Sequence, residues 1–344
     1  MLRSEEVRVV RADKGAVLVL PADRFAHDLR DGDAEPVRVA LDRDGLVSSR
    51  DGQRCAPTVG DVLDVDDGHA VLLHERRTAL VRDSAGATSR EQALAANVDV
   101  VLIVEHLDPD PDLGRVERML TLAWRSGAQP VVVLTKADLV PDPEGMAADV
   151  AAVALAVDVH TVSVPAGTGL DGLRTLLRPG VTLVVVGPSG AGKSTLVNAL
   201  AGREVMDTGG QRNDGRGRHT TTHRQLVPLA GGAMLIDTPG IRGVGLVADA
   251  AALDTTFADV AELAELCRFA DCHHAGDAGC AIQEALATGE LTERRFDSWR
   301  RLAKEAAYQA RRSDARLAAE ERDRWKRITK EYQRGLRGPG HPRS

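Results

Sequence analysis

A glycine-rich segment in the second half of the chain has the residue types and spacing of a phosphate-binding loop. Gly187, Gly192, Lys193 and Ser194 follow an apolar run and precede a helix-like stretch. The glycines allow successive backbone N–H groups to surround phosphate oxygens, and the helix start favours negative charge. Lys193 is expected to reach the β- and γ-phosphates, and Ser194 to bind Mg²⁺ through its hydroxyl. The predicted nucleotide-binding residues of this segment are Gly187, Pro188, Ser189, Gly190, Ala191, Gly192, Lys193, Ser194 and Thr195.

A second acidic position lies downstream of this loop. Asp237 ends an apolar run and is followed by Thr238, Pro239 and Gly240. A carboxylate at such a strand end can hold Mg²⁺, and a glycine three residues later allows its N–H to approach the γ-phosphate. We therefore predict that Asp237 and Gly240 contact the nucleotide and that Asp237 is also a magnesium ligand.

The segment 209–223 separates the two motifs and is rich in Gly, Arg and Asn. Its position is that of a first switch, in which Thr221 or Thr222 completes the magnesium shell; the sequence does not choose between them. Ile241 occupies the position where Ras-like enzymes carry the glutamine that orients the attacking water. His219 is the nearest group able to orient water near neutral pH, so it is the predicted catalytic residue. A loop histidine without this role is the alternative.

Base choice depends on a motif that precedes the phosphate loop. Thr135-Lys136-Ala137-Asp138 follows an apolar run and resembles the guanine-specificity motif Asn-Lys-x-Asp. Asp138 can accept hydrogen bonds from guanine N1–H and the exocyclic amino group, which adenine does not offer, while the Lys136 stem covers the base. Thr135 replaces the usual Asn, whose hydrogen bond ties this loop to the phosphate loop; a hydroxyl could replace that bond in part. Ser163, in a segment resembling the loop that contacts guanine O6, completes the predicted GTP-binding residues. An ATP-dependent kinase or ATPase is the alternative.

The order of these motifs is unusual for a GTPase. Both base-recognition segments precede Gly187, whereas in most GTPases with this loop they follow it. Because chain termini in a compact domain often lie close together, they can be rejoined elsewhere without changing the site. The order is that of the circularly permuted GTPases.

Three cysteines and a histidine near the C-terminus have the spacing of a metal site. Cys267, Cys272, His274 and Cys280 supply three thiolates and one imidazole, a set suited to a closed tetrahedral Zn²⁺ site with a structural role. His273 is the neighbouring alternative ligand. Cys55 lies too far along the chain to be assigned to this site.

Composition sets the broad class of the protein. The 344 residues are 43% hydrophobic and 28% charged, which is usage typical of globular proteins. No run of about 18 apolar residues and no signal peptide occurs, so we expect a cytoplasmic protein without a membrane segment. The net charge is −7, but residues 292–344 carry 16 Lys and Arg against 8 Asp and Glu. This basic tail is suited to contact nucleic acid; a solvated helix with internal ion pairs is the alternative.

The pattern of apolar runs predicts a multidomain protein. Residues 1–80 hold short runs separated by turns, which indicates a small all-β barrel or sandwich, and a five-stranded OB-like barrel is one candidate. Residues 81–247 alternate strand-like and helical stretches and form the predicted α/β phosphate-loop GTPase domain, circularly permuted, with a sheet covered on both faces. Residues 248–344 form the predicted α-helical zinc-binding domain with its basic tail.

Together these motifs resemble the ribosome small-subunit-dependent GTPase A family, also called RsgA or YjeQ. The resemblance depends on the permuted order, the Cys/His spacing, and the segments 92–99, 217–222 and 237–240, and it covers nearly the whole chain. It implies the three-domain fold given above, with GTP and Mg²⁺ at the nucleotide site and one structural Zn²⁺.

The resemblance also implies a function. It predicts a monomeric, cytoplasmic GTPase that binds the small (30S) ribosomal subunit and its 16S rRNA, and whose hydrolysis of GTP is stimulated by that subunit during late 30S maturation. His219 matches the histidine proposed as catalytic in the family. The alternative is a zinc-containing RNA-binding module with a mainly structural nucleotide site.

Overall fold

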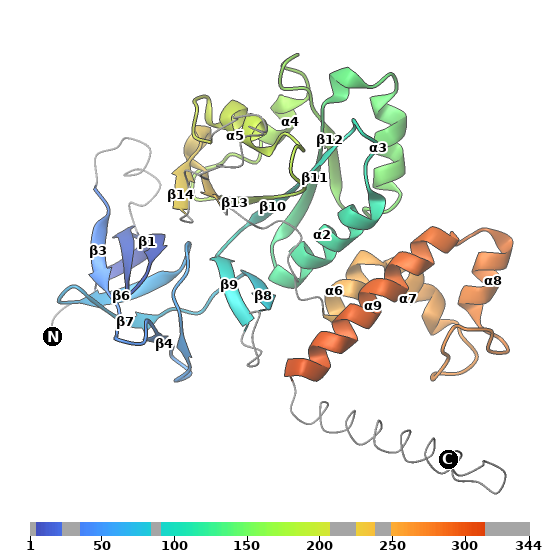
Figure 1. The fold of residues 1–344 in the computed structure, drawn as a ribbon, viewed down its shortest axis with the longest axis horizontal. Coiled ribbons are helices and arrows are strands. Elements are labelled where there is room, and N and C mark those ends of the chain that lie inside the picture. The colour runs from blue at the N-terminus through green and yellow to red at the C-terminus, as the bar shows by residue number, and fades with distance from the viewer. Residues whose placement is uncertain (1–4, 23–34, 84–90, 207–224, 238–248, 314–344) are drawn as a thin grey trace, which may run out of the picture.

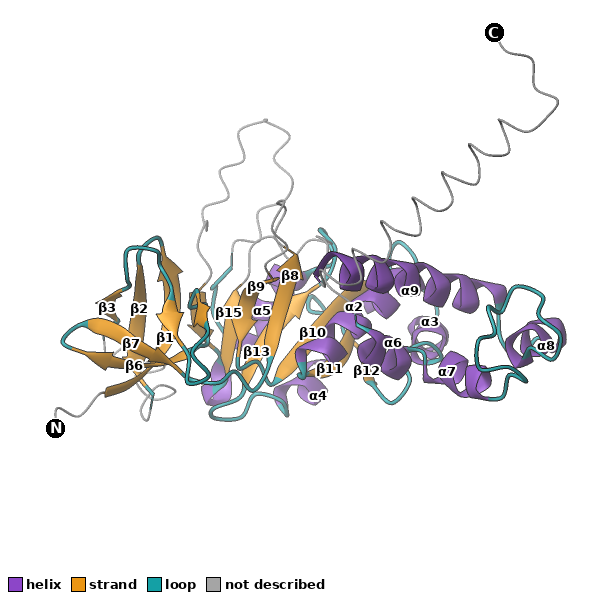
Figure 2. Ribbon diagram, turned by 90° about the horizontal axis from the view of Figure 1, so that it is seen from below, coloured by secondary structure: helices purple, strands orange, loops and turns teal. Residues whose placement is uncertain are grey.

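The computed structural model describes residues 5–22, 35–83, 91–206, 225–237 and 249–313 (Figure 1). A barrel, a central sheet with helices and a group of helices follow one another along the molecule (Figure 2). No helix within these described ranges is long and apolar enough to span a bilayer.

The N-terminal part is a closed five-stranded barrel. β1 pairs antiparallel with β2 and β6, and parallel pairing of β3 with β7 completes the ring. This strand order confirms the expected OB-like barrel. Every second residue of the strands points inward, so that Val9, Val17, Val39 and Leu63 fill the interior. The strands are β1 (Glu5–Asp13), β2 (Ala16–Pro21), β3 (Val37–Ala40), β6 (Val62–Asp66) and β7 (His69–Leu73), with a short hairpin of β4 (Val47–Ser48) and β5 (Arg54–Cys55).

The central sheet has the alternating order expected of an α/β domain. Its strands lie in the order β12-β11-β10-β13-β15-β14, all parallel except β14. Helices α2 and α3 pack on one face and α4 and α5 on the other, so the strands are apolar on both faces. The elements are β10 (Val100–His106), α2 (Leu113–Ser126), β11 (Gln129–Thr135), η1 (Ala137–Leu139), α3 (Pro143–Ala151), β12 (Asp158–Thr161), α4 (Leu170–Arg174), β13 (Thr182–Val186), α5 (Lys193–Ala201), β14 (Gln225–Pro228), η2 (Ala230–Gly232) and β15 (Met234–Asp237).

The barrel and the central sheet are physically continuous. β1 pairs with β14 through Arg11 and Gln225, which joins them into one 11-stranded sheet. From β1, Arg8 donates a 2.8 Å hydrogen bond to Thr182 Oγ1 at the start of β13, and burial lowers the pKa of Arg8 to about 10. A hairpin of β8 (Ala79–Asp83) and β9 (Glu91–Ala96), which the sequence pattern does not reveal, adds further buried side chains at this junction.

The C-terminal part is helical, as expected, and no strand occurs among residues 249–313. The helices are α6 (Ala250–Thr256), α7 (Ala258–Glu265), α8 (Ala281–Thr288) and α9 (Glu293–Ser313). They surround Phe257, Val260 and Ile282, all fully buried. Phe257 separates α6 from α7.

Helix α2 connects the central sheet to the C-terminal helices. The carboxylate of Glu117, which has no exposed area, accepts hydrogen bonds from Arg294 at 3.0 Å and from Arg295 at 2.8 Å. Arg295 also donates to Asp259 and lies over the ring of Phe257 at 4.3 Å. Since every charge in this buried group has a partner, it fixes α9 against α2.

Candidate nucleotide site and metal centre

The predicted nucleotide-binding residues lie at one edge of the sheet. β10, β11, β12, β13 and β15 are parallel, so their carboxyl ends meet at this edge. In open α/β sheets this is where ligands bind. The phosphate loop follows β13 and the base-recognition loop follows β11. Segments that are far apart in the sequence therefore contribute to one site.

The glycines of the phosphate loop are required by its backbone. Gly187 has φ 144°, and a Cβ built there would lie 2.1 Å from the Val104 carbonyl oxygen. Gly192, with φ 79°, ends the loop in the left-handed region and starts α5. Only glycine permits both the close approach to β10 and this turn into the helix.

Lys193 lies across the phosphate loop. Its Nζ donates to the carbonyl oxygens of Gly187 at 3.0 Å and Pro188 at 2.5 Å. The ammonium group is therefore close to the backbone that surrounds the predicted phosphate position. Ser194 follows in the first turn of α5 and is partly exposed.

Thr135 links the base-recognition loop to the phosphate loop. Its hydroxyl lies 2.7 Å from the carbonyl oxygen of Ala191 and 3.2 Å from that of Glu105. The single hydroxyl proton can be donated to only one of them at a time, and the shorter contact is to the phosphate loop. Thr135 thus makes the hydrogen bond between the two loops that the usual Asn makes in the guanine-specificity motif.

Asp138 and Ser163, which the sequence places in separate motifs, are in contact. The Ser163 hydroxyl donates a 2.5 Å hydrogen bond to Asp138 Oδ1 and accepts one from the backbone N–H of Ala166. Ser163 is only 1% exposed, whereas Asp138 is exposed. The serine therefore orients the carboxylate, and the carboxylate faces the open edge.

Lys136 has the backbone of a tight loop. It lies in the left-handed region with φ 62°, and its Nζ donates to the Asp108 carbonyl oxygen at 2.8 Å. Ala137 follows, with its N–H donating to the Val162 carbonyl oxygen. These bonds tie the base-recognition loop to the ends of two neighbouring strands.

Several predicted residues lie outside the described part of the chain. Asp237 ends β15, beside β13, so its backbone is at the same sheet edge as the phosphate loop. Its side chain is not described. The residues His219, Thr221, Thr222 and Gly240 lie outside the described residues altogether.

The four predicted metal ligands converge in the loop between α7 and α8. All four ligand atoms lie within 4.8 Å of one another. His274 Nδ1 lies 3.6 Å from Cys267 Sγ and 3.5 Å from Cys280 Sγ, and these two sulfurs are 4.0 Å apart. Tetrahedral Zn²⁺ with bonds of about 2.0–2.3 Å places its ligand atoms roughly 3.5–3.8 Å apart. The group can hold a metal ion of this kind.

Two residues that the sequence analysis does not identify support this loop. Asp277 accepts backbone hydrogen bonds from His273 and Ala275 and lies 3.6 Å from Cys272 Sγ. Gln283 donates to the carbonyl oxygen of His274 at 2.8 Å. His273 itself is exposed and its Nδ1 lies 2.6 Å from the Asp271 carbonyl oxygen, so His274 is the histidine of the cluster.

The sequence motifs also do not predict a buried ion pair that lies beside the phosphate loop. Glu105, at the end of β10 and 1% exposed, accepts hydrogen bonds from Arg115 at 2.7 and 2.9 Å. These bonds raise the pKa of Arg115. A charged residue at the end of an otherwise apolar strand was the signal that could have indicated this pair.

Comparison with known proteins gives consistent matches. Residues 73–247 match the RsgA GTPase family. A Streptomyces coelicolor protein named "Small ribosomal subunit biogenesis GTPase RsgA" is 46% identical over 328 residues, covering 93% of this chain and 85% of that protein. "Small ribosomal subunit biogenesis GTPase RsgA 2" of Listeria monocytogenes is 45% identical, covering 82% of this chain and 81% of that protein.

Two solved structures share the fold. YjeQ from Thermotoga maritima has a TM-score of 0.63 at 23% identity and covers 88% of this chain and 99% of its own. YloQ, described as a circularly permuted GTPase, has a TM-score of 0.59 at 22% identity, covering 89% and 96%. The permuted arrangement expected from the motif order is thus the arrangement of this chain, and the extent of the sequence matches shows that it belongs to the RsgA GTPase family.

Proposed function

We propose that this protein is a GTPase that acts in biogenesis of the small ribosomal subunit and hydrolyses GTP to GDP and phosphate when stimulated by that subunit. The observation that carries the proposal is the joining of the two predicted half-sites: Thr135 bonds the phosphate loop, and Ser163 orients Asp138. A phosphate-binding part and a guanine-binding part are thereby held in one fixed relation. The names of the relatives supply the ribosomal context.

The residues of the phosphate loop would bind and orient the triphosphate. On binding, Lys193 would exchange its bonds to the Gly187 and Pro188 carbonyl oxygens for phosphate oxygens, and the N–H groups that start α5 would add further donors. Ser194, Asp237 and a switch threonine, Thr221 or Thr222, would hold Mg²⁺, which neutralises charge that develops on the phosphates. The Gly240 N–H would bond the γ-phosphate, and His219 would orient the attacking water.

The base-recognition loop would select guanine. Asp138 is exposed and already oriented by Ser163, so its second oxygen and the free lone pairs can accept from guanine N1–H and the amino group. Adenine offers no such donor pair. The Lys136 stem would lie over the base.

The remaining parts would serve binding to the subunit. We assign the OB-like barrel to residues 1–80, the permuted GTPase domain to 81–247 and the zinc-binding helical domain to 248–344. Cys267, Cys272, His274 and Cys280 would hold one Zn²⁺, whose bonds fix a loop with few apolar side chains of its own. The barrel and the zinc domain would contact 16S rRNA, and the protein would work as a cytoplasmic monomer.

The decisive experiment is GTP hydrolysis by the full chain with and without small subunits. We expect a large increase in kcat with subunits, and the increase should be lost in His219→Ala while GTP still binds. A wild-type rate that does not change at saturating subunit would contradict the proposal. It would favour an RNA-binding module in which the nucleotide is only structural. Equal competition of ATP and GTP for a labelled nucleotide would contradict the assigned base.

A further inference from the structure

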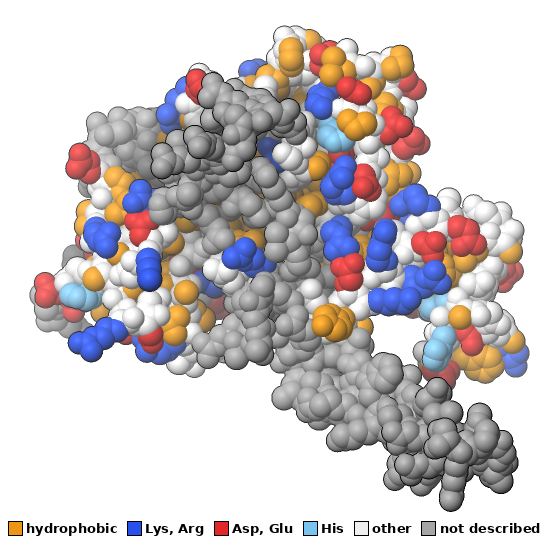
Figure 3. All heavy atoms as spheres, in the orientation of Figure 1, with side chains coloured by type: hydrophobic (Ala, Val, Ile, Leu, Met, Phe, Trp, Pro, Cys, Tyr) orange, Lys and Arg blue, Asp and Glu red, His pale blue; other side chains and the backbone are white. Residues whose placement is uncertain are grey.

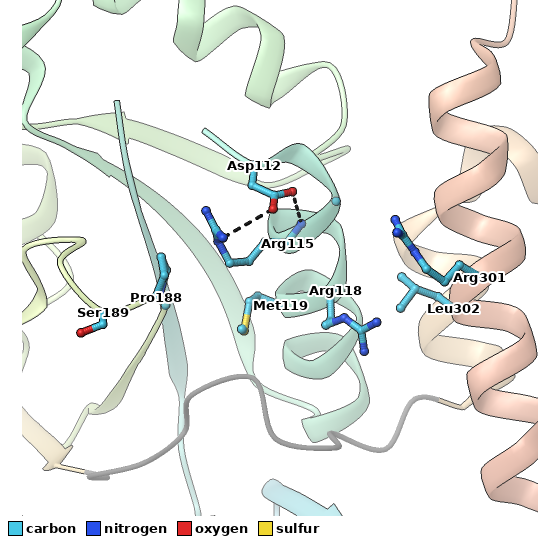
Figure 4. A pocket seen from close by; sticks show the side chains of 10 residues that line it. Asp112, Arg115, Arg118, Met119, Pro188, Ser189, Arg301 and Leu302 are labelled. Carbon is cyan, nitrogen blue, oxygen red and sulfur yellow. Dashed lines mark hydrogen bonds and ion pairs between the residues drawn. The ribbon is translucent and has the colours of Figure 1, made fainter. Parts of the chain in front are cut away.

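A cavity of about 380 Å³ lies where α2, α9 and the start of the phosphate loop meet (Figure 4). Pro188 and Ser189 of the loop form one wall, and α2 and α9 form the others. Met119 and Leu302 contribute apolar surface to the lining. The cavity therefore lies next to the loop but on the side of the C-terminal helices, apart from the base-recognition loop.

Three arginines and the carboxylate of Asp112 line this cavity. Arg115 is bonded to Glu105, and Arg118 donates two hydrogen bonds of 2.6 and 2.7 Å to Glu305. Arg301 forms no hydrogen bond or ion pair with any residue in the described ranges. In Figure 4 Arg118 extends from α2 toward α9, and Arg301 extends from α9 toward the start of α2. The Glu305 carboxylate is thus hydrogen-bonded to Arg118, and the charge of Arg301 also acts on it.

Hydrogen-bond donors outnumber acceptors around Glu305 and the buried hydroxyl of Ser298. Hydrogen bonds from Arg118 lower the pKa of Glu305, and the charge of Arg301 lowers it further. Ser298 is 2% exposed, and its Oγ has no hydrogen-bond partner among the described residues. Ser298 Oγ and Arg301 Nη2 both face Gly114 in the first turn of α2, at 3.9 and 3.4 Å from the position of a Cβ there. Two donors that have no hydrogen-bond acceptor among the described residues, Ser298 Oγ and Arg301, therefore lie at the positive end of this helix.

Resting on the proposed role in subunit biogenesis, we propose that this cavity binds a backbone phosphate of the small-subunit RNA, with Arg301 as its principal donor. The planar guanidinium fork matches two phosphate oxygens, and apolar walls strengthen such a contact by excluding water. Lys304, one turn further along α9, is exposed and likewise unpaired within the described chain, so a second phosphate of the same strand has a cation to contact. Figure 3 shows Lys and Arg side chains gathered on the surface over α2 and α9.

The location gives the contact a consequence for hydrolysis. Ser189 lies in the phosphate loop, and a phosphate held in the cavity would rest between that loop and α9. RNA bound there would restrain the loop from the outside while the nucleotide occupies its inner side. Binding of the subunit and the rate of GTP hydrolysis would then depend on the same side chain.

The experiment compares Arg301→Ala with Arg300→Ala in the full, zinc-loaded chain. Arg300 is the matched control, because it is exposed on the same helix but already paired with Asp297 at 2.7 Å and lies outside the cavity lining. Affinity for small subunits is measured by co-sedimentation with a non-hydrolysable GTP analogue over a range of salt. We expect Arg301→Ala to weaken binding about tenfold, as for the loss of a charge-assisted hydrogen bond, and to reduce the log–log salt slope by about one. Arg301→Lys should recover part of the affinity, and Arg300→Ala should match the wild type.

The ratio of subunit-stimulated to unstimulated hydrolysis should fall with the affinity in Arg301→Ala, and its melting temperature should stay that of the wild type. Equal effects of the two alanine variants, or none, would overturn the inference. If wild type and Arg301→Ala bind subunits equally well, the inference is wrong but the proposed function stands. If the wild type itself does not bind subunits, the proposed function is contradicted.

Two further arms identify the source of the anion. Weaker binding of Arg301→Ala to subunits but unchanged binding to protein-free 16S rRNA would overturn the RNA assignment in favour of an acidic protein. If the wild type binds inorganic phosphate and Arg301→Ala does not, while the subunit affinity of the two proteins is the same, the cavity would be assigned to a small free anion instead. We expect Arg301→Ala to lose affinity equally for subunits and for free rRNA, and the wild type not to bind inorganic phosphate at millimolar concentration.

Discussion

The hydroxyl of Thr135 lies 2.7 Å from the carbonyl oxygen of Ala191, and this hydrogen bond joins the base-recognition loop to the phosphate loop. Thr135→Val keeps the shape of the side chain but removes the donor. We expect GTP affinity to fall by roughly three- to tenfold, since a buried hydrogen bond contributes about 0.5–1.5 kcal/mol. Titration with a fluorescent GTP analogue measures this. Thr256→Val removes a similar buried bond, to Ala252 within α6, and should leave nucleotide affinity unchanged.

Asp138→Asn should exchange guanine for xanthine preference. The amide presents a donor where guanine N1–H and the amino group require acceptors, whereas xanthine carries a carbonyl oxygen in place of the amino group. We expect GTP affinity to fall at least tenfold and XTP affinity to rise, as measured by competition. Ser163→Ala should cause a milder loss for GTP, because it leaves the carboxylate but removes the group that orients it. Unchanged GTP affinity in Asp138→Asn would contradict the assigned base contact.

Glu117→Gln should destabilise the attachment of the C-terminal helices. It leaves Arg294 without its buried charge partner and Arg295 with Asp259 alone. Losing one member of a buried ionic group costs about 3 kcal/mol. Trp124 in α2 and Trp299 in α9 report unfolding on both sides of this contact by fluorescence. Asp297→Asn, which breaks an exposed pair on α9, should change stability by less than about 0.5 kcal/mol.

Removal of the metal should unfold the loop between α7 and α8. We expect elemental analysis to find one zinc per chain in the wild type and none in Cys280→Ser, and the loop of the variant to be sensitive to protease, because structural Zn²⁺ contributes folding free energy directly. Cys55→Ser in β5 of the barrel is the matched control and should retain its zinc. A wild-type protein purified without metal, yet resistant to protease, would argue against a structural zinc.

The ion pair between Arg118 and Glu305 should give a small, acid-sensitive stabilisation. Because the folded-state pKa of Glu305 is lowered from 4.5, its contribution is fully present above pH 4.5 and is lost as the pH falls through the folded value. The pair is partly exposed, so Glu305→Gln should cost less than about 1 kcal/mol at pH 7. Melting temperatures of the two proteins should differ at pH 7 and converge as the pH falls below 4.5 and through the folded-state pKa of Glu305. A difference that does not shrink with acidification would mean that the carboxylate charge is not its source.

Much of the site follows from local sequence. The phosphate loop, the Thr135–Asp138 loop and the four metal ligands are each short segments whose residue types are fixed by chemistry, and parallel strands must bring their ends to one edge. The start of α2 is likewise local, because the Asp112 side chain caps it by accepting a hydrogen bond from the Arg115 N–H.

The rest depends on contacts between distant segments, which no local pattern records. The β8–β9 hairpin is rich in Ala and charged residues, so it lacks the usual strand signature and is stabilised by burial against the core. The link from Thr135 to Ala191 and the pairing of Glu117 with Arg295 span 56 and 178 residues. Only the folded chain shows which charged residues of α9 face α2 and which face solvent.

The ion pairs of helix α2 depend on its exact length. Within its 14 residues it holds Glu105 through Arg115, Arg295 through Glu117, Glu305 through Arg118 and, near its end, Asp249 through Arg125. An α-helix turns about 100° per residue, so inserting or deleting one residue between Arg118 and Arg125 would rotate Arg125 away from Asp249 while the other pairs stay in place. The helix therefore fixes both the spacing and the angular position of these four ion pairs, so that a change in chain length is tolerated only outside α2.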